Sequence, residues 1–98
     1  RGAIENTYRL QLTNSLETER RYRLAVTGVP GLRIDSATGL TVPAAGSASV
    51  PLRLVLPADA AQRQAGQTLH ATVLVIPDGL ADEGTPAARA EAAFTVPR

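Results

Sequence analysis

The chain has few side chains that could do chemistry, and they do not form a recognisable catalytic set. His70 is the single histidine and could bind copper, but the sequence supplies no cysteine or methionine to complete such a site. Asp78, Asp82 and Glu83 fall in one predicted loop, yet their spacing lacks the alternating oxygen ligands of a calcium loop. No serine lies in a nucleophile elbow, and no glycine-rich phosphate loop occurs. We therefore predict no catalytic, cofactor-binding or metal-binding residue, and no enzyme activity in this chain.

Four arginines remain as candidates for contact with a partner protein or with lipid. They are Arg9, Arg21, Arg23 and Arg53. All four fall on outward faces of predicted strands, and the first three would form a basic stripe if the first two strands pair. The alternative is that carboxylates neutralise them as exposed cross-strand pairs, each worth roughly a few tenths of a kcal/mol. The candidate carboxylates are Glu5, Glu17, Glu19 and Glu91.

Composition limits the classes of function that remain. A chain of 98 residues fits one domain, since domains cluster at roughly 100 to 150 residues. The net charge of +1 is too small for a nucleic-acid binder. The absence of cysteine excludes disulfides and iron–sulfur ligation by this chain alone. No apolar run approaches the roughly 20 residues that span a bilayer, and a start at Arg1 suggests a piece of a longer protein.

Alternation of apolar and polar residues with a period of two predicts strands over most of the chain. In the first strand Tyr8, Leu10 and Leu12 share one face, which we expect to be buried. Seven such runs occur at spacings near those of a β-sandwich, and a barrel of five or six strands is the alternative. The predicted strands cover residues 4–13, 19–27, 32–34, 40–42, 47–56, 69–76 and 88–96.

Two features interrupt the strand pattern. Pro51 cannot donate a backbone hydrogen bond, so its strand should have an uncovered edge or a bulge at that point. Residues 58–65 favour one short helical turn, because they are rich in alanine and because Asp59 and Gln62 have the spacing of a capping box. Gly66 is suited to end that helix. The fold class we predict is all-β, a seven-stranded sandwich with one helical turn.

Five short motifs in order resemble a known family. They are Glu-Asn-x-Tyr-Arg-Leu-Gln-Leu-x-Asn at 5–14, Arg-Tyr-Arg-Leu at 21–24, Gly-Val-Pro-Gly-Leu at 28–32, Val-Pro-Leu-Arg-Leu at 50–54 and Phe-Thr-Val-Pro-Arg at 94–98. The chain is similar to the C-terminal immunoglobulin-like domain of FixG-type cytochrome oxidase accessory proteins, also called CcoG. It lacks the cysteine pair and core tryptophan of antibody domains. The resemblance implies that residues 1–98 form a single immunoglobulin-like domain, a fragment of a longer membrane protein.

The resemblance also implies a functional setting. FixG-type proteins carry transmembrane helices and ferredoxin-like cysteine motifs for two 4Fe-4S clusters, and they serve assembly of cbb3-type oxidase, apparently by reducing copper. By analogy, this domain would lie on the periplasmic side of the bacterial inner membrane, tethered through upstream segments. It would hold no cofactor itself and would act as an interaction or stabilising module. Oxidase assembly factors or the parent's own membrane domain are the expected partners, and nucleic acid is not.

Two other functions compete with this interpretation. A generic extracellular β-sandwich module could bind partners by strand addition at an exposed edge, for instance the one interrupted by Pro51. Such a module predicts further β-domains beside it in the same gene. An enzyme or an independent metal carrier is the third hypothesis, which stoichiometric copper on the purified fragment would support.

Overall fold

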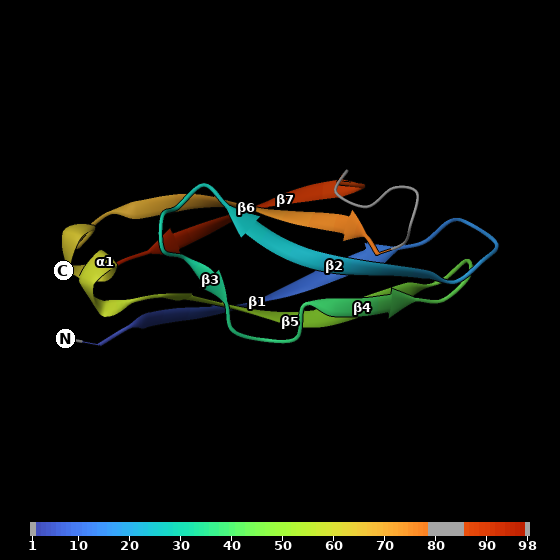
Figure 1. Cartoon of the computed structure of the whole chain (residues 1–98), viewed down its shortest axis with the longest axis horizontal. Helices are drawn as coiled ribbons and strands as arrows, with labels where there is room; N and C mark the ends of the chain where they lie inside the picture. The colour runs from blue at the N-terminus through green and yellow to red at the C-terminus, as the bar shows by residue number, and fades with distance from the viewer. Residues whose placement is uncertain (1, 79–85, 98) are drawn as a thin grey trace.

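Two antiparallel sheets and one short helix make up the molecule (Figure 1). A computed structural model describes residues 2–78 and 86–97. The elements in chain order are β1 (Ile4–Thr13), β2 (Arg20–Thr27), β3 (Arg33–Ile34), β4 (Gly39–Val42), β5 (Ser47–Leu56), α1 (Ala58–Arg63), β6 (Thr68–Pro77) and β7 (Ala88–Thr95). The predicted strands are confirmed with small shifts at their ends.

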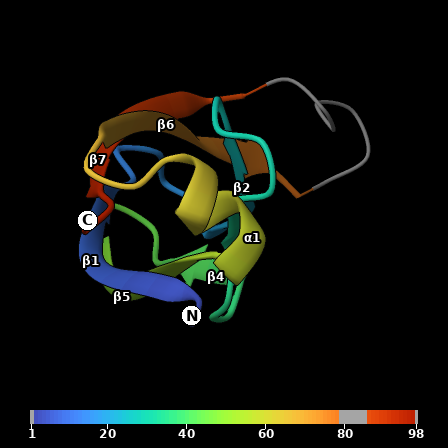
Figure 2. The same cartoon turned by 90° about the vertical axis from the view of Figure 1, so that its left-hand side faces the viewer.

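The seven strands divide into two layers. One sheet has the order β1-β5-β3 and the other has the order β4-β2-β6-β7. Seen end on, the two sheets face one another and α1 lies across one end of the space between them (Figure 2). The predicted all-β, immunoglobulin-like sandwich is therefore confirmed. β1 pairs with β5 and not with β2, so the condition on which the basic stripe depended is not met.

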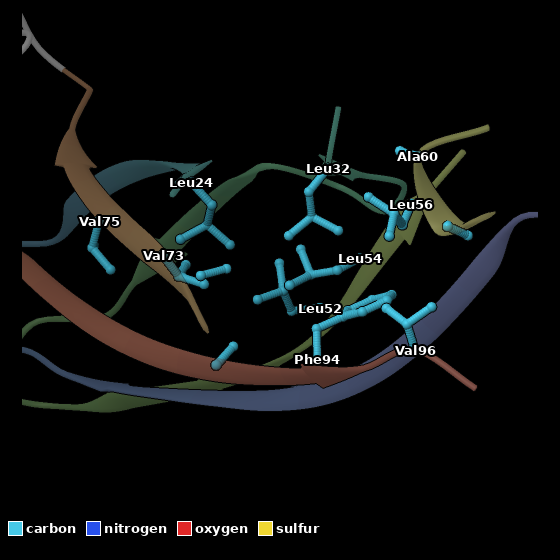
Figure 3. Packing of buried hydrophobic residues seen from close by; sticks show 13 residues of the cluster. Leu24, Leu32, Leu52, Leu54, Leu56, Ala60, Val73, Val75, Phe94 and Val96 are labelled. Carbon is cyan, nitrogen blue, oxygen red and sulfur yellow. The ribbon is translucent and has the colours of Figure 1, made fainter. Parts of the chain in front are cut away.

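Aliphatic side chains from both layers fill the core (Figure 3). β5 contributes Leu52, Leu54 and Leu56, each at most 2% exposed, because alternate residues of a strand point to the same face. Phe94 of β7 is fully buried and is the largest side chain in the core. The other buried core positions of β6 and β7 carry valine or alanine, as at Val73, Ala71 and Ala92. A thin, mainly aliphatic core follows from this composition.

The helix closes one end of the core. Ala60 and Ala61 of α1 are buried against the hydrophobic cluster, so the alanine-rich turn serves packing as well as helix propensity. The predicted capping role of Asp59 is wrong. The N-cap position is Pro57, with no side-chain cap, and Asp59 lies inside the first turn with its Oδ2 3.7 Å from Nη1 of Arg63. A carboxylate there still interacts favourably with the helix dipole.

Candidate interaction surface

The structure separates the four candidate arginines onto opposite faces of the sandwich. Arg9 and Arg53 lie on the outer face of the β1-β5-β3 sheet as diagonal neighbours, two register positions apart. Arg21 and Arg23 lie on the outer face of the β4-β2-β6-β7 sheet. The stripe expected from pairing of the first two strands does not form, since β1 and β2 belong to different sheets. Any contact through these side chains must use one face or the other.

Arg53 and Arg9 are each engaged in local contacts. Nε of Arg53 donates a 2.9 Å hydrogen bond to the carbonyl oxygen of Asp35 and lies 3.9 Å from that residue's Oδ2. Nη1 of Arg9 donates to Oγ of Ser49 at 3.2 Å. Both arginines are exposed, so these contacts orient the side chains without removing their charge from solvent. This face therefore presents two positioned guanidinium groups.

Arg21 and Arg23 have a different setting. Arg21 is exposed and Arg23 is half-buried, in register with Gly39 on one side and Ile76 on the other. The ion pairs among the described residues join Arg53 to Asp35 and Arg63 to Asp59. None of the carboxylates proposed from the sequence as neutralising partners takes part in them. Within residues 2–78 and 86–97, the predicted cross-strand pairs are thus not formed.

The remaining candidate residues form no metal site in the part of the chain that is described. His70 is exposed on the outer face of β6, opposite Ala93. No group of three or more histidine, cysteine or acidic side chains converges among the described residues. Asp78 is exposed after β6, whereas Asp82 and Glu83 lie outside the described residues. A shallow depression on the outer face of β6 and β7 is lined by Thr72, Arg89, Ala90 and Glu91.

One long edge of the β1-β5-β3 sheet is open. The N–H of Arg53 donates to Oγ of Ser36 and its C=O accepts from the N–H of Asp35, so both groups point away from β1. Because backbone groups of successive strand residues point to opposite sides, the even-numbered residues of β5 bond to β1. The odd-numbered residues of β1 then direct their N–H and C=O groups outward, and no described residue bonds to them. We call these groups, at residues 5, 7, 9, 11 and 13, the open β1 edge.

A tyrosine links this edge strand to the other sheet. The hydroxyl of Tyr8 donates to the carbonyl oxygen of Ala93 in β7 at 2.6 Å. That carbonyl faces away from β6, by the same alternation that applies to β1. The edges of β1 and β7 accordingly lie along the same side of the sandwich (Figure 2).

The edge at Pro51 is not suited to strand addition. β5 is the middle strand of its sheet, and its register with β1 runs through Pro51 without a bulge. Pro51 lies two residues from Arg53, so its backbone groups point to the same side, toward β3 and away from β1. β3 ends at Ile34 and leaves this position uncovered, and the proline nitrogen carries no hydrogen. The predicted uncovered edge is confirmed, but it cannot offer a donor at this position.

Asn14 organises the end of the sandwich opposite α1. It is 3% exposed, and its Nδ2 donates to the carbonyl oxygens of Thr18, Pro43 and Val42 at 2.9, 3.1 and 3.4 Å. Its Oδ1 accepts from the N–H of Leu16 at 3.0 Å. These bonds give Asn14 a structural role in the loop. Sequence reasoning did not single out Leu16, which the same loop holds at 48% exposure.

Comparisons with known proteins agree with this architecture. Residues 1–97 match a protein family described as "IG-like fold at C-terminal of FixG, putative oxidoreductase". Protein RdxA of Cereibacter sphaeroides is 40% identical over 95 residues, which are 95% of this chain and 20% of RdxA. The chain thus spans about one fifth of the length of this curated relative. No helix among the described residues has the length and apolar character needed to cross a bilayer.

A solved structure supports the fold in particular. The crystal structure of a FixG-related protein from Vibrio parahaemolyticus superposes with a TM-score of 0.67 at 20% sequence identity. The match covers 94% of this chain and 78% of the solved chain. At this identity the likeness concerns the arrangement of strands, and the solved chain contains residues beyond the matched part.

Proposed function

The chain belongs to the family of immunoglobulin-like domains at the C-terminus of FixG, and from this premise we propose that it is a non-catalytic interaction or stabilising domain. The observation that carries the proposal is the family match over residues 1–97, which takes in nearly the whole chain. The coverage of only 20% of RdxA supports a parent whose other functions lie in other segments. In that arrangement the domain contributes surface and stability, while chemistry takes place elsewhere in the parent.

We further propose that the parent is a FixG/CcoG-like membrane protein with 4Fe-4S clusters bound upstream. Its role is assembly of a cbb3-type cytochrome oxidase and handling of copper for that enzyme. The domain lies on the periplasmic side of the bacterial inner membrane and contacts either oxidase assembly factors or the parent's own membrane domain. The candidate arginines Arg9, Arg21, Arg23 and Arg53 are the side chains that the fold offers for such contacts.

The sequence of the full-length gene provides the first test. The proposal predicts hydrophobic spans and Cys-x-x-Cys-x-x-Cys-x-x-x-Cys runs upstream of residue 1. A gene that encodes neither feature, and that encodes further β-domains beside this one, would favour the generic extracellular module instead.

A deletion experiment separates docking from redox chemistry. Removing residues 1–98 from the full-length protein should lower the amount of assembled oxidase while leaving the electron paramagnetic resonance signal of the upstream clusters intact. A variant with one cluster cysteine replaced by serine is the matched control, since it should lose that signal and retain the β-domain. Full oxidase assembly after deletion of the domain would contradict the proposal.

A further inference from the structure

The four sheet edges of this sandwich are not equally protected. β3 has two residues and β4 has four, and short edge strands discourage pairing with other chains. In β7 the carbonyl of Ala93 is already bonded to Tyr8. β1, in contrast, is ten residues long and pairs with β5 in an unbroken register from Ile4 to Thr13. It contains no proline and no bulge, so its open edge is a regular template for one more strand.

The inward side chains of β1 point to the same conclusion. Ile4, Tyr8, Leu10 and Leu12 pack against the core, yet every inward residue of β1 is only half-buried. The inward β5 residues Leu52, Leu54 and Leu56 are at most 2% exposed. Val50 and Ala48, opposite Leu10 and Leu12, are half-buried like β1. The fully buried part of β5 is the part beside β3, which pairs with Val55 and Leu54, whereas β1 has a neighbouring strand on one side only. A strand beside β1 would complete the burial of these apolar groups.

We propose that the polypeptide immediately preceding residue 1 in the full-length protein turns back and adds to the open β1 edge as an antiparallel strand. β1 begins at Ile4, so a short hairpin loop suffices to bring the preceding residues alongside it. In an immunoglobulin sheet of order A-B-E-D, the strand preceding B lies beside B at the edge. Here β5 pairs with β1 on one side and with β3 on the other, as strand E does with B and D.

The lengths of the relatives make such a segment available. The family lies at the C-terminus of FixG, and this chain corresponds to only 20% of RdxA, so a parent of that kind has ample polypeptide to supply the strand. A strand supplied by the same chain also has a high effective concentration, because the connecting loop is short. This pairing does not depend on the role proposed above for the domain in oxidase assembly.

A second copy of the domain fits the edge less well. Two antiparallel β1 strands that overlap over their full open edges, residues 5 to 13, would place Arg9 directly opposite Arg9 of the other copy. Like charges directly opposite one another on neighbouring strands are destabilising. The edge is therefore better suited to a strand of different sequence than to itself.

Hydrogen exchange of the β1 amides in the full-length protein tests the proposal residue by residue. Amides of Asn6, Tyr8, Leu10 and Leu12 already bond to β5 and serve as internal references. The outward amides of Thr7, Arg9 and Gln11 should exchange at least about tenfold more slowly in the full-length protein than in the 98-residue chain. The protection should not change when the protein is diluted, since the pairing is within one molecule.

Two variants of one residue provide a matched control. Arg9→Pro removes both the guanidinium group and the outward N–H, whereas Arg9→Ala removes only the guanidinium group and its bond to Ser49. In the full-length protein Arg9→Pro should abolish the slow exchange of Thr7 and Gln11, and Arg9→Ala should preserve it.

Fast exchange of the outward amides in the wild-type full-length protein would overturn the proposal, and this measurement requires no variant. Protection that disappears on dilution would also overturn it, by showing that the strand comes from a second copy or another protein. Full oxidase assembly after deletion of the domain would refute the proposed function alone, and would leave this strand pairing in the intact protein unaffected.

Discussion

The hydroxyl of Tyr8 reaches the carbonyl oxygen of Ala93 at 2.6 Å, although the two residues are 85 positions apart in the chain. This bond joins the edge strands of two sheets that share no backbone pairing. It fixes the separation of the sheets along the side of the sandwich where both edges are open to solvent (Figure 2). Tyr8 thus closes the sandwich laterally, as α1 does at one end.

Replacing Tyr8 by phenylalanine should destabilise the domain modestly. The substitution retains the ring and removes one hydrogen bond, so the free energy of unfolding should fall by about 0.5 to 1.5 kcal/mol. Urea denaturation followed by circular dichroism measures the change. Tyr22→Phe is the matched control, because the Tyr22 hydroxyl makes no hydrogen bond to any described residue. Equal effects of the two substitutions would contradict a specific role for the Tyr8 hydroxyl.

Asn14→Ala should be far more damaging. It leaves three carbonyl groups without the donor they share and frees the N–H of Leu16, so we expect a loss of about 2 to 4 kcal/mol. Asn14→Asp should fare no better, since a carboxylate cannot donate to those carbonyls. Asn6→Ala, which removes a half-buried amide with a single 3.5 Å contact, should cost much less. A thermal unfolding series in which Asn6→Ala lowers the melting temperature as much as Asn14→Ala does would refute this assignment.

Gly28 should tolerate no side chain. Its φ of +101° disfavours other residues, and an added Cβ would lie 3.2 Å from the carbonyl oxygen of His70 on the paired β6 strand. Gly28→Ala should therefore cost about 1 to 3 kcal/mol. Gly39→Ala adds a methyl group in open space and should change the stability by less than about 0.5 kcal/mol. Chemical denaturation of the pair distinguishes local strain from a general effect of replacing glycine.

The arginines of β2 should be tested apart from those on the opposite face. Reversing both charges by Arg21→Glu and Arg23→Glu in the full-length protein should weaken binding to an acidic partner or anionic lipid. The expected cost is about 1 to 2 kcal/mol, or roughly five- to thirtyfold in affinity. Oxidase assembly in cells that carry the variant is the measurement.

A second double reversal controls for net charge. Arg33→Glu with Arg89→Glu makes the same change at exposed arginines that are not among the proposed contacts. Normal assembly with the β2 variant, or equal loss with both variants, would rule out a specific contact through Arg21 and Arg23.

Local patterns account for the elements of this fold, but they do not determine its pairing. The bounds of β1 and β5 follow from alternation alone, since ten residues of period two have one consistent interpretation. That β1 pairs with β5 depends on contacts more than thirty residues apart in the chain, which leave no local signal. For this reason the sequence could offer the basic stripe only as a condition, since the stripe required β1 and β2 to be neighbours.

Alternation also fails where the outer face is itself covered. By alternation along their strands, Val55 and Ile76 point to the outer faces of the sheets, yet they are only 5% and 6% exposed. Val55 lies in register between Glu5 and Arg33, whose side chains flank it from both neighbouring strands. Period two predicts the direction of a side chain, whereas its burial depends on what lies on the strands beside it.

The elongated shape of the sandwich, 48 Å in its longest dimension, has a mechanical consequence. Both chain ends lie at the α1 end, and the loop held by Asn14 lies at the other (Figure 1). With the preceding segment paired antiparallel along β1 as proposed, the parent attaches beside that loop, close to the exposed Leu16 and the β2 residues Arg21 and Arg23, and the α1 end points away from the parent. The length of the domain then sets how far the α1 end reaches from the point of attachment, and the hydrogen bonds of Asn14 hold the loop beside that point in place.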